Sequence, residues 1–267
     1  MRAPLAVFRL EKWYFDCVSS DGAVFIGYAA RLKWGPVRLS YGATITKSKD
    51  GRLSQRQSPS CGRLSGGRES ISWCNDGLKA SGEWTGGEPI AKTVVVDEPS
   101  GRIEWQCLSA NASVDVRTDG RAMTGTGYVE KLSMTIPPWK LPFTELRWGR
   151  FISDDRNDYL VWIDLRGRTQ RNWIWVNSGE ALAGTVDDDR VRTDGAELVF
   201  ESSQPVRAEN IARTLLGRLE FLKRLLPERL WAIREDKRVS SCSLRTEGSE
   251  SRGSSINEVV RWRRAGA

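Results

Sequence analysis

Alternation of apolar and polar residues with a period of two dominates this chain and constrains its fold most. A period of two is that of a β-strand with one buried face. Asp-Gly is a favoured two-residue hairpin turn because both central positions need positive φ, and the chain has such pairs at 21–22, 50–51, 76–77, 119–120 and 194–195. The pattern predicts strands at 13–18, 23–30, 36–46, 70–74, 92–97, 102–108, 121–132, 145–152, 159–165, 171–177, 196–201, 237–246 and 255–263.

Many short strands with regular turns indicate an all-β protein of the sandwich or barrel class. The length of 267 residues allows one large all-β domain or two smaller ones. The Pro-rich stretch 136–142 is the best candidate hinge, so we expect domains at 1–135 and 136–267. The polar, Ser- and Gly-rich segments 48–68 and 247–254 are expected to be loops.

One segment departs from this pattern. Between 208 and 226, Ile211, Leu215 and Leu219 recur at helical spacing with basic residues between them, and Pro227 follows. The spacing predicts one amphipathic helix in the C-terminal half. We expect it to pack on the protein, and a membrane-surface helix is the alternative.

The chain has no histidine. This excludes Ser-His-Asp and Cys-His catalysis and metal sites built on His. The phosphate-binding and dinucleotide-binding glycine motifs are also missing. Acid–base chemistry by a carboxylate, Tyr or Lys remains, or binding without chemistry.

Five cysteines without close pairing favour free thiols in a reducing compartment. No apolar run reaches the roughly 18 residues of a membrane span, and the N-terminal apolar stretch is too short for a signal peptide. We therefore expect a cytoplasmic protein. The net charge of +7 is spread along the chain, which favours a solvated surface over a nucleic-acid or anionic-lipid site.

Two carboxylates are candidates for acid–base work. Strand alternation places Glu130 on one face with Tyr128, and Asp164 on one face with Trp162. If 159–165 and 171–177 form a hairpin, we expect the two Trp residues of the second strand to flank Asp164. Desolvation among aromatic rings favours a neutral carboxyl group that can donate a proton. The alternative for each is a solvent-exposed carboxylate or one paired with Arg.

Residues 127–151 hold large aromatic side chains, three Pro and two Arg close together, which suggests a shaped site. Arg147 and Arg150 flank Trp148 there. They could pair with a carboxylate of the protein or bind an anionic substrate group in a bidentate manner.

Three segments resemble the motifs of the carotenoid 1,2-hydratase (hydroxyneurosporene synthase) family: 12–16 (KWYFD), 127–130 (GYVE) with 146–151 (LRWGRF), and 255–262 (SINEVVRW). The family also includes attachment-related lipocalin-like proteins. The resemblance implies two lipocalin-like antiparallel β-barrels and hydration or cyclisation, without a cofactor, of a bulky isoprenoid or polyketide-like molecule.

The resemblance also implies the site. Asp164, in Trp162-Ile163-Asp164, matches the family's suggested proton donor, and Glu130 would be a second acid–base or orienting group. Glu130 and Lys131 stand where the hydratases have Asp-His, and Asn257 stands where they often have His, which argues against carotenoid hydration itself. The residues implied to contact the ligand are Tyr14, Tyr128, Trp139, Arg147, Trp148, Arg150, Trp162 and Asn257.

The leading hypothesis is therefore a cofactor-free lyase or isomerase with a hydrophobic ligand in an aromatic pocket. A non-enzymatic lipid or pigment carrier is the first alternative. A binder of nucleic acid or anionic membrane is the second; we expect no nucleic-acid partner, and peripheral membrane contact and the oligomeric state stay open.

Overall fold

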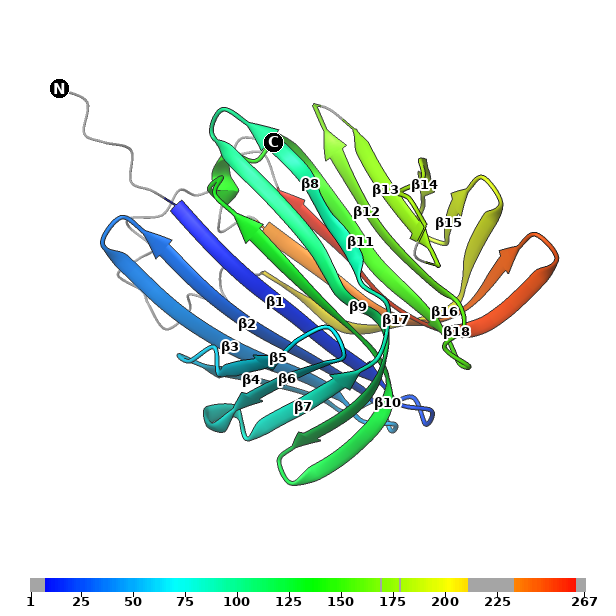
Figure 1. Cartoon of the computed structure of the whole chain (residues 1–267), viewed down its shortest axis with the longest axis horizontal. Coiled ribbons are helices and arrows are strands. Elements are labelled where there is room, and N and C mark those ends of the chain that lie inside the picture. The colour runs from blue at the N-terminus through cyan, green and yellow to red at the C-terminus, as the bar shows by residue number, and fades with distance from the viewer. Residues whose placement is uncertain (1–7, 169, 178, 211–232, 263–267) are drawn as a thin grey trace. The chain divides into compact units, whose positions relative to one another are not determined.

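The chain folds into antiparallel β-sheets (Figure 1). A computed structural model describes residues 8–168, 170–177, 179–210 and 233–262. The chain divides into two compact units, 1–137 and 138–267. In the described part, helical structure is limited to two short 3₁₀ turns, η1 (Asp76–Leu78) and η2 (Pro138–Lys140). The expected all-β class is confirmed.

The first unit is one ten-stranded sheet with the order β4-β3-β2-β1-β10-β9-β7-β6-β5, and β8 pairs with β9. Its strands are β1 (Phe8–Val18), β2 (Val24–Trp34), β3 (Val37–Lys47), β4 (Leu53–Ser58), β5 (Arg63–Gly66), β6 (Ser70–Asn75), β7 (Ala80–Thr85), β8 (Ile90–Glu98), β9 (Gly101–Thr118) and β10 (Arg121–Met134).

Aromatic side chains fill the core of the first unit. Phe15 stacks on Trp73 with ring centroids 5.4 Å apart and lies 5.0 Å from Trp84. The indole N–H of Trp84 donates to the backbone oxygen of Asp16 at 2.7 Å, and that of Trp73 to the oxygen of Cys61 at 2.9 Å. Buried indoles need such partners, so these two rings both fill space and tie strands together.

The second unit is one eight-stranded sheet with the order β13-β12-β11-β18-β17-β16-β15-β14. Its strands are β11 (Phe143–Ser153), β12 (Tyr159–Gly167), β13 (Arg171–Val176), β14 (Gly184–Val186), β15 (Arg190–Thr193), β16 (Ala196–Asn210), β17 (Ile233–Thr246) and β18 (Ser249–Trp262).

The two end strands of this second sheet approach each other. Ile174 and Leu182 form an isolated bridge, and the Asn172 side-chain amide donates to the Gly184 oxygen at 2.6 Å. The sheet is therefore nearly closed. The expectation of two closed barrels is met only in part, because neither sheet closes by strand pairing within the described residues.

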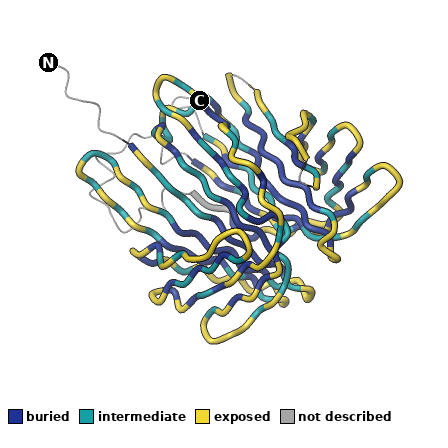
Figure 2. Tube along the Cα trace, in the orientation of Figure 1, coloured by how far each residue is buried: buried dark blue, intermediate teal, exposed yellow. Residues whose placement is uncertain are grey.

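Burial follows the strands, and the turns are exposed (Figure 2). Of the Asp-Gly pairs, only 119–120 has positive φ at both residues, 49° and 77°. At 21–22, 50–51 and 194–195 only the Gly has positive φ. The pair 76–77 lies in η1, inside the four-residue loop that joins the antiparallel strands β6 and β7, so it turns a hairpin but not as a two-residue turn.

Other expectations also change. The predicted loops at 48–68 and 247–254 contain β4, β5 and the first residues of β18. Of the predicted helix at 208–226, the first three residues belong to β16 instead, and the rest lies outside the described residues. In the described part of the chain, no helix has the length and apolarity needed to cross a bilayer.

Candidate functional site

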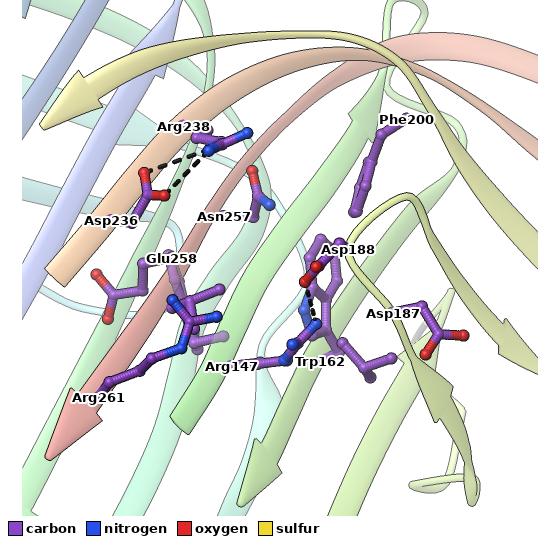
Figure 3. Close-up of a pocket in the computed structure, with 13 residues that line it drawn as sticks. Arg147, Trp162, Asp187, Asp188, Phe200, Asp236, Arg238, Asn257, Glu258 and Arg261 are labelled. Atoms are coloured by element: carbon purple, nitrogen blue, oxygen red, sulfur yellow. Dashed lines mark hydrogen bonds and ion pairs between the residues drawn. The ribbon is translucent and has the colours of Figure 1, made fainter. Parts of the chain in front are cut away.

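The second unit contains a pocket of about 280 Å³. Residues of β11, β12, β16, β17 and β18 line it, together with Val186 at the end of β14 and with Asp187 and Asp188 in the turn that follows. Figure 3 shows the labelled side chains projecting from these strands and from this turn. Seven of the thirteen lining residues are charged, so the lining is less aromatic than expected: Arg147, Asp187, Asp188, Asp236, Arg238, Glu258 and Arg261.

Strand register explains why these side chains meet. Trp162 of β12 lies opposite Gly149 of β11, which lies opposite Asn257 of β18, which lies opposite Arg238 of β17. Residues directly opposite each other in an antiparallel sheet share a face. One row across four strands therefore carries three pocket residues and a glycine.

Gly149 makes room for the indole of Trp162. A Cβ atom at position 149 would lie 2.2 Å from Cζ2 of Trp162, closer than side chains approach. The ring consequently lies over the backbone of β11. Its centroid is 5.9 Å from that of Phe200, and both rings pack on the apolar cluster of the second unit. They form the apolar wall of the pocket.

The next row on the same face carries three charged residues. Asp164, Arg147, Val259 and Asp236 lie opposite one another across β12, β11, β18 and β17. Arg147 donates from Nε to Glu145 at 2.7 Å and from Nη1 to Asp188 at 2.7 Å. Burial opposes the charge of Arg147, but these two carboxylates outweigh it and raise the pKa of its guanidinium.

The remaining pocket arginines are also paired. Arg238 donates from Nε and Nη2 to Asp236 at 3.3 and 3.0 Å, as Figure 3 shows. Arg261 donates from Nε to Glu145 at 2.9 Å. Burial raises the pKa of Glu145, but hydrogen bonds from Arg147 and Arg261 outweigh burial and hold that pKa below its usual value.

Asp164 is fully buried on the same face as Trp162. Its Oδ2 accepts from Nε of Arg166 at 2.6 Å, so the alternative of an Arg-paired carboxylate is the one found. Its Oδ1 has no hydrogen-bond partner among the described residues. Asp164 does not itself line the pocket; Arg147 and Trp162 beside it do.

The prediction that Trp173 and Trp175 flank Asp164 was wrong. Asn172 of β13 lies opposite Asp164, and Ile174 lies opposite Trp162. Trp173 and Trp175 therefore project from the other face of the sheet, next to Ile163 and Val161.

Glu130 lies in the first unit. It is 8% exposed and accepts hydrogen bonds at Oε2 from Trp105 Nε1 at 2.5 Å and from Tyr128 OH at 3.0 Å. Burial, followed by the charges of Cys107 and Glu130, raises the pKa of Tyr128 well above its ordinary value. The Tyr14 ring lies 6.2 Å from that of Tyr128. These residues form a second candidate acid–base cluster.

Of the other residues expected to contact the ligand, two line the pocket and two do not. Trp148 lies at the pocket, and its ring lies 5.2 Å from Lys237 Nζ. Asn257 lines the pocket, and its Oδ1 is buried without a hydrogen-bond partner among the described residues. Arg150 is buried and donates to the Ser254 oxygen at 3.0 Å, and Trp139 lies in η2; neither lines the pocket.

Sequence reasoning missed Gly149, Phe200, Arg238 and Asp188. Gly149 lies within the segment 127–151, between Trp148 and Arg150. Its role is visible only from the pairing of β11 with β12, which sets it opposite Trp162. Nothing local distinguishes Phe200 or Arg238. Within the described residues, no group of three or more Cys, Asp and Glu is arranged to hold a metal ion.

No protein-family model and no curated protein matches the chain. Solved structures do. Kievitone hydratase from Nectria haematococca has a TM-score of 0.56 at 10% identity, covering 94% of this chain and 88% of the hydratase. The protein CghA has a TM-score of 0.52 at 12% identity, covering 97% and 90%. A structure of CghA with Sch210972 gives 0.50 at 12%, covering 96% and 89%.

At these identities the likeness shows the fold. It agrees with the resemblance of the three sequence segments to the hydratase family, and that resemblance is confirmed at this level. The chain therefore has the fold shared by kievitone hydratase and CghA.

Proposed function

We propose that this chain is a hydratase- or cyclase-type enzyme that works without a cofactor on a hydrophobic small molecule held in the pocket of the second unit. One observation carries the proposal: a fully buried carboxyl group, Asp164, adjoins an aromatic-walled pocket and has an oxygen without a partner among the described residues. Leaving such a group unsatisfied costs about 1–3 kcal/mol. Groups of this kind in native proteins call for an explanation, and a catalytic role is one.

In this proposal Asp164 is the acid–base group and Arg166 orients it through the 2.6 Å hydrogen bond. Trp162, two residues away on the same face, would stabilise positive charge on the reacting carbon by cation–π attraction, worth roughly 2 kcal/mol when desolvated. Arg147 lies opposite Asp164 in the strand register. A shift of the Arg147 side chain toward the ligand would expose Asp164 to the pocket.

The size of the pocket narrows the substrate. Small-molecule pockets commonly measure about 300–1,000 Å³, and this one measures about 280 Å³. A compact ring system fits better than a long isoprenoid chain. Glu130, with Tyr128, stays a proposed second acid–base group in the first unit.

The test is to incubate the purified chain with lipophilic extracts in isotope-labelled water and to follow small molecules by mass spectrometry. A hydratase adds labelled water to a substrate, and a cyclase that protonates carbon incorporates deuterium without a change in composition. We expect a labelled product with the wild type and none with Asp164→Asn. A fully active Asp164→Asn variant would remove Asp164 from the mechanism.

A carrier without chemistry is the second candidate. The observation that favours it is that Asp164 lies outside the pocket lining and is bound to Arg166. A carrier would bind and return its ligand unlabelled, and Asp164→Asn would leave binding unchanged. The same incubation therefore separates the two functions.

A further inference from the structure

The pocket combines an aromatic wall with guanidinium groups on one face of one sheet. Trp162 and Phe200 form the wall, and Arg147, Arg238 and Arg261 come from three neighbouring strands, β11, β17 and β18. Aromatic rings select a flat apolar body, and guanidinium groups select planar oxygen pairs such as a carboxylate.

The arginines differ in how firmly they are held. Arg238 is bound by both of its contacting nitrogens to one carboxylate, Asp236. Arg261 uses only Nε, toward Glu145, so its terminal nitrogens have no partner among the described residues. Arg147 likewise uses Nε and Nη1 and leaves Nη2 without a partner in the described part of the chain.

The two carboxylates on Arg147 are unequal. The Glu145 side chain is 19% exposed and also accepts from Arg261, whereas the Asp188 side chain is 83% exposed at the turn between β14 and β15. An ion pair of an exposed side chain contributes about 0–1 kcal/mol. Asp188 is therefore a weakly held carboxylate on a mostly buried guanidinium, and Figure 3 shows it beside Arg147 and Trp162.

We infer that the ligand of this pocket is a compact aromatic or conjugated molecule that ends in a carboxylate, and that this carboxylate replaces Asp188 on Arg147. The ring body lies against Trp162 and Phe200, and the carboxylate accepts from Arg147 and Arg261. The inference rests on the proposed function only in taking this pocket as the substrate site, and it names the substrate class.

The test measures binding of naphthoate and of its uncharged methyl ester to the full chain, by titration calorimetry and tryptophan fluorescence. Hydrogen bonds to a charged group contribute about 1.5–3 kcal/mol. We therefore expect the wild type to bind naphthoate at least about tenfold more tightly than the ester. Equal or tighter binding of the ester would overturn the inference, as would no binding of either compound.

Asp188→Asn removes the competing carboxylate without changing its shape. It should tighten naphthoate binding by about 1.5- to fivefold, which is what an exposed pair typically contributes, and leave the ester unchanged. Asp189→Asn is the matched control, because Asp189 lies next in the same turn but pairs with Arg190 at 2.7 Å. Identical affinities in Asp188→Asn, Asp189→Asn and wild type would refute the displacement of Asp188.

Arg147→Gln should lower the preference for naphthoate, because only Arg261 then contacts the carboxylate, and should keep the affinity for the ester. Binding and turnover separate the two proposals. Carboxylate-selective binding without any labelled product would leave this inference standing and remove the enzymatic proposal. A labelled product from a neutral substrate, with no preference for a carboxylate, would support the enzymatic proposal and overturn this inference.

Discussion

The substitution Gly149→Ala tests the packing of the pocket wall most sharply. The new methyl group would lie 2.2, 2.6 and 2.7 Å from three atoms of the Trp162 indole. The ring is 2% exposed and packs against Phe200, so it cannot swing aside freely. Overpacking a well-filled core costs typically 1–3 kcal/mol, and we expect a loss of that size in the free energy of unfolding of the second unit.

The assay is urea unfolding followed by tryptophan fluorescence, with hydrogen exchange of β11 and β12 to assign the transition to the second unit. Gly67→Ala is the control, because nothing lies within 4 Å of its added Cβ; we expect a change within about 0.5 kcal/mol. Trp162→Phe removes the clashing ring atoms, so the double variant Gly149→Ala/Trp162→Phe should lose at least about 1 kcal/mol less than the two single changes together. A fully stable Gly149→Ala variant with additive energies would refute the proposed packing.

Four further predictions concern charge. Glu130→Gln removes a negative charge beside Tyr128 and should lower the pKa of Tyr128, measured by phenolate absorbance; an unchanged titration would contradict that coupling. Because the folded pKa of Tyr128 is raised, its contribution to stability should be full below about pH 10 and be lost as pH rises further. The pKa of Glu145 is lowered, so Glu145→Gln should destabilise the chain above about pH 4.3 and lose its effect as pH falls through the folded pKa; a pH-independent difference would argue otherwise. Lys237 is fully buried between Glu258 and Glu235; Lys237→Met should cost about 3–5 kcal/mol, and the added Glu258→Gln should recover part of it, as denaturation curves would reveal.

Strand alternation was sufficient to place Asp164 with Trp162 and Glu130 with Tyr128, because the period of two belongs to the strand itself. The register between neighbouring strands could not be predicted from this alternation. Trp173 and Trp175 were expected beside Asp164, but the register sets Asn172 opposite it. A difference of one residue in register moves every side chain of a strand to the other face.

The pocket depends on pairings between segments that are distant in sequence. β11 lies between β12 and β18, and only that arrangement places Gly149 between Trp162 and Asn257. Asp188 lies in a polar turn. The sequence of a turn has no periodic pattern from which the contacts of its side chains could be predicted. The segments 48–68 and 247–254 were taken as loops because their residues are mostly polar; β4, for example, is mostly exposed and lacks the alternating signal.

We propose that the second unit binds a hydrophobic small molecule in the pocket walled by Trp162 and Phe200. Native mass spectrometry of the purified full chain, with organic extraction of what co-purifies, would detect such a ligand. We expect a compact conjugated molecule bound to the wild type and lost from Gly149→Ala, because the added methyl group presses on the indole that forms the pocket wall. A bare mass for both proteins, with no change in tryptophan fluorescence when aromatic ligands are added, would contradict it.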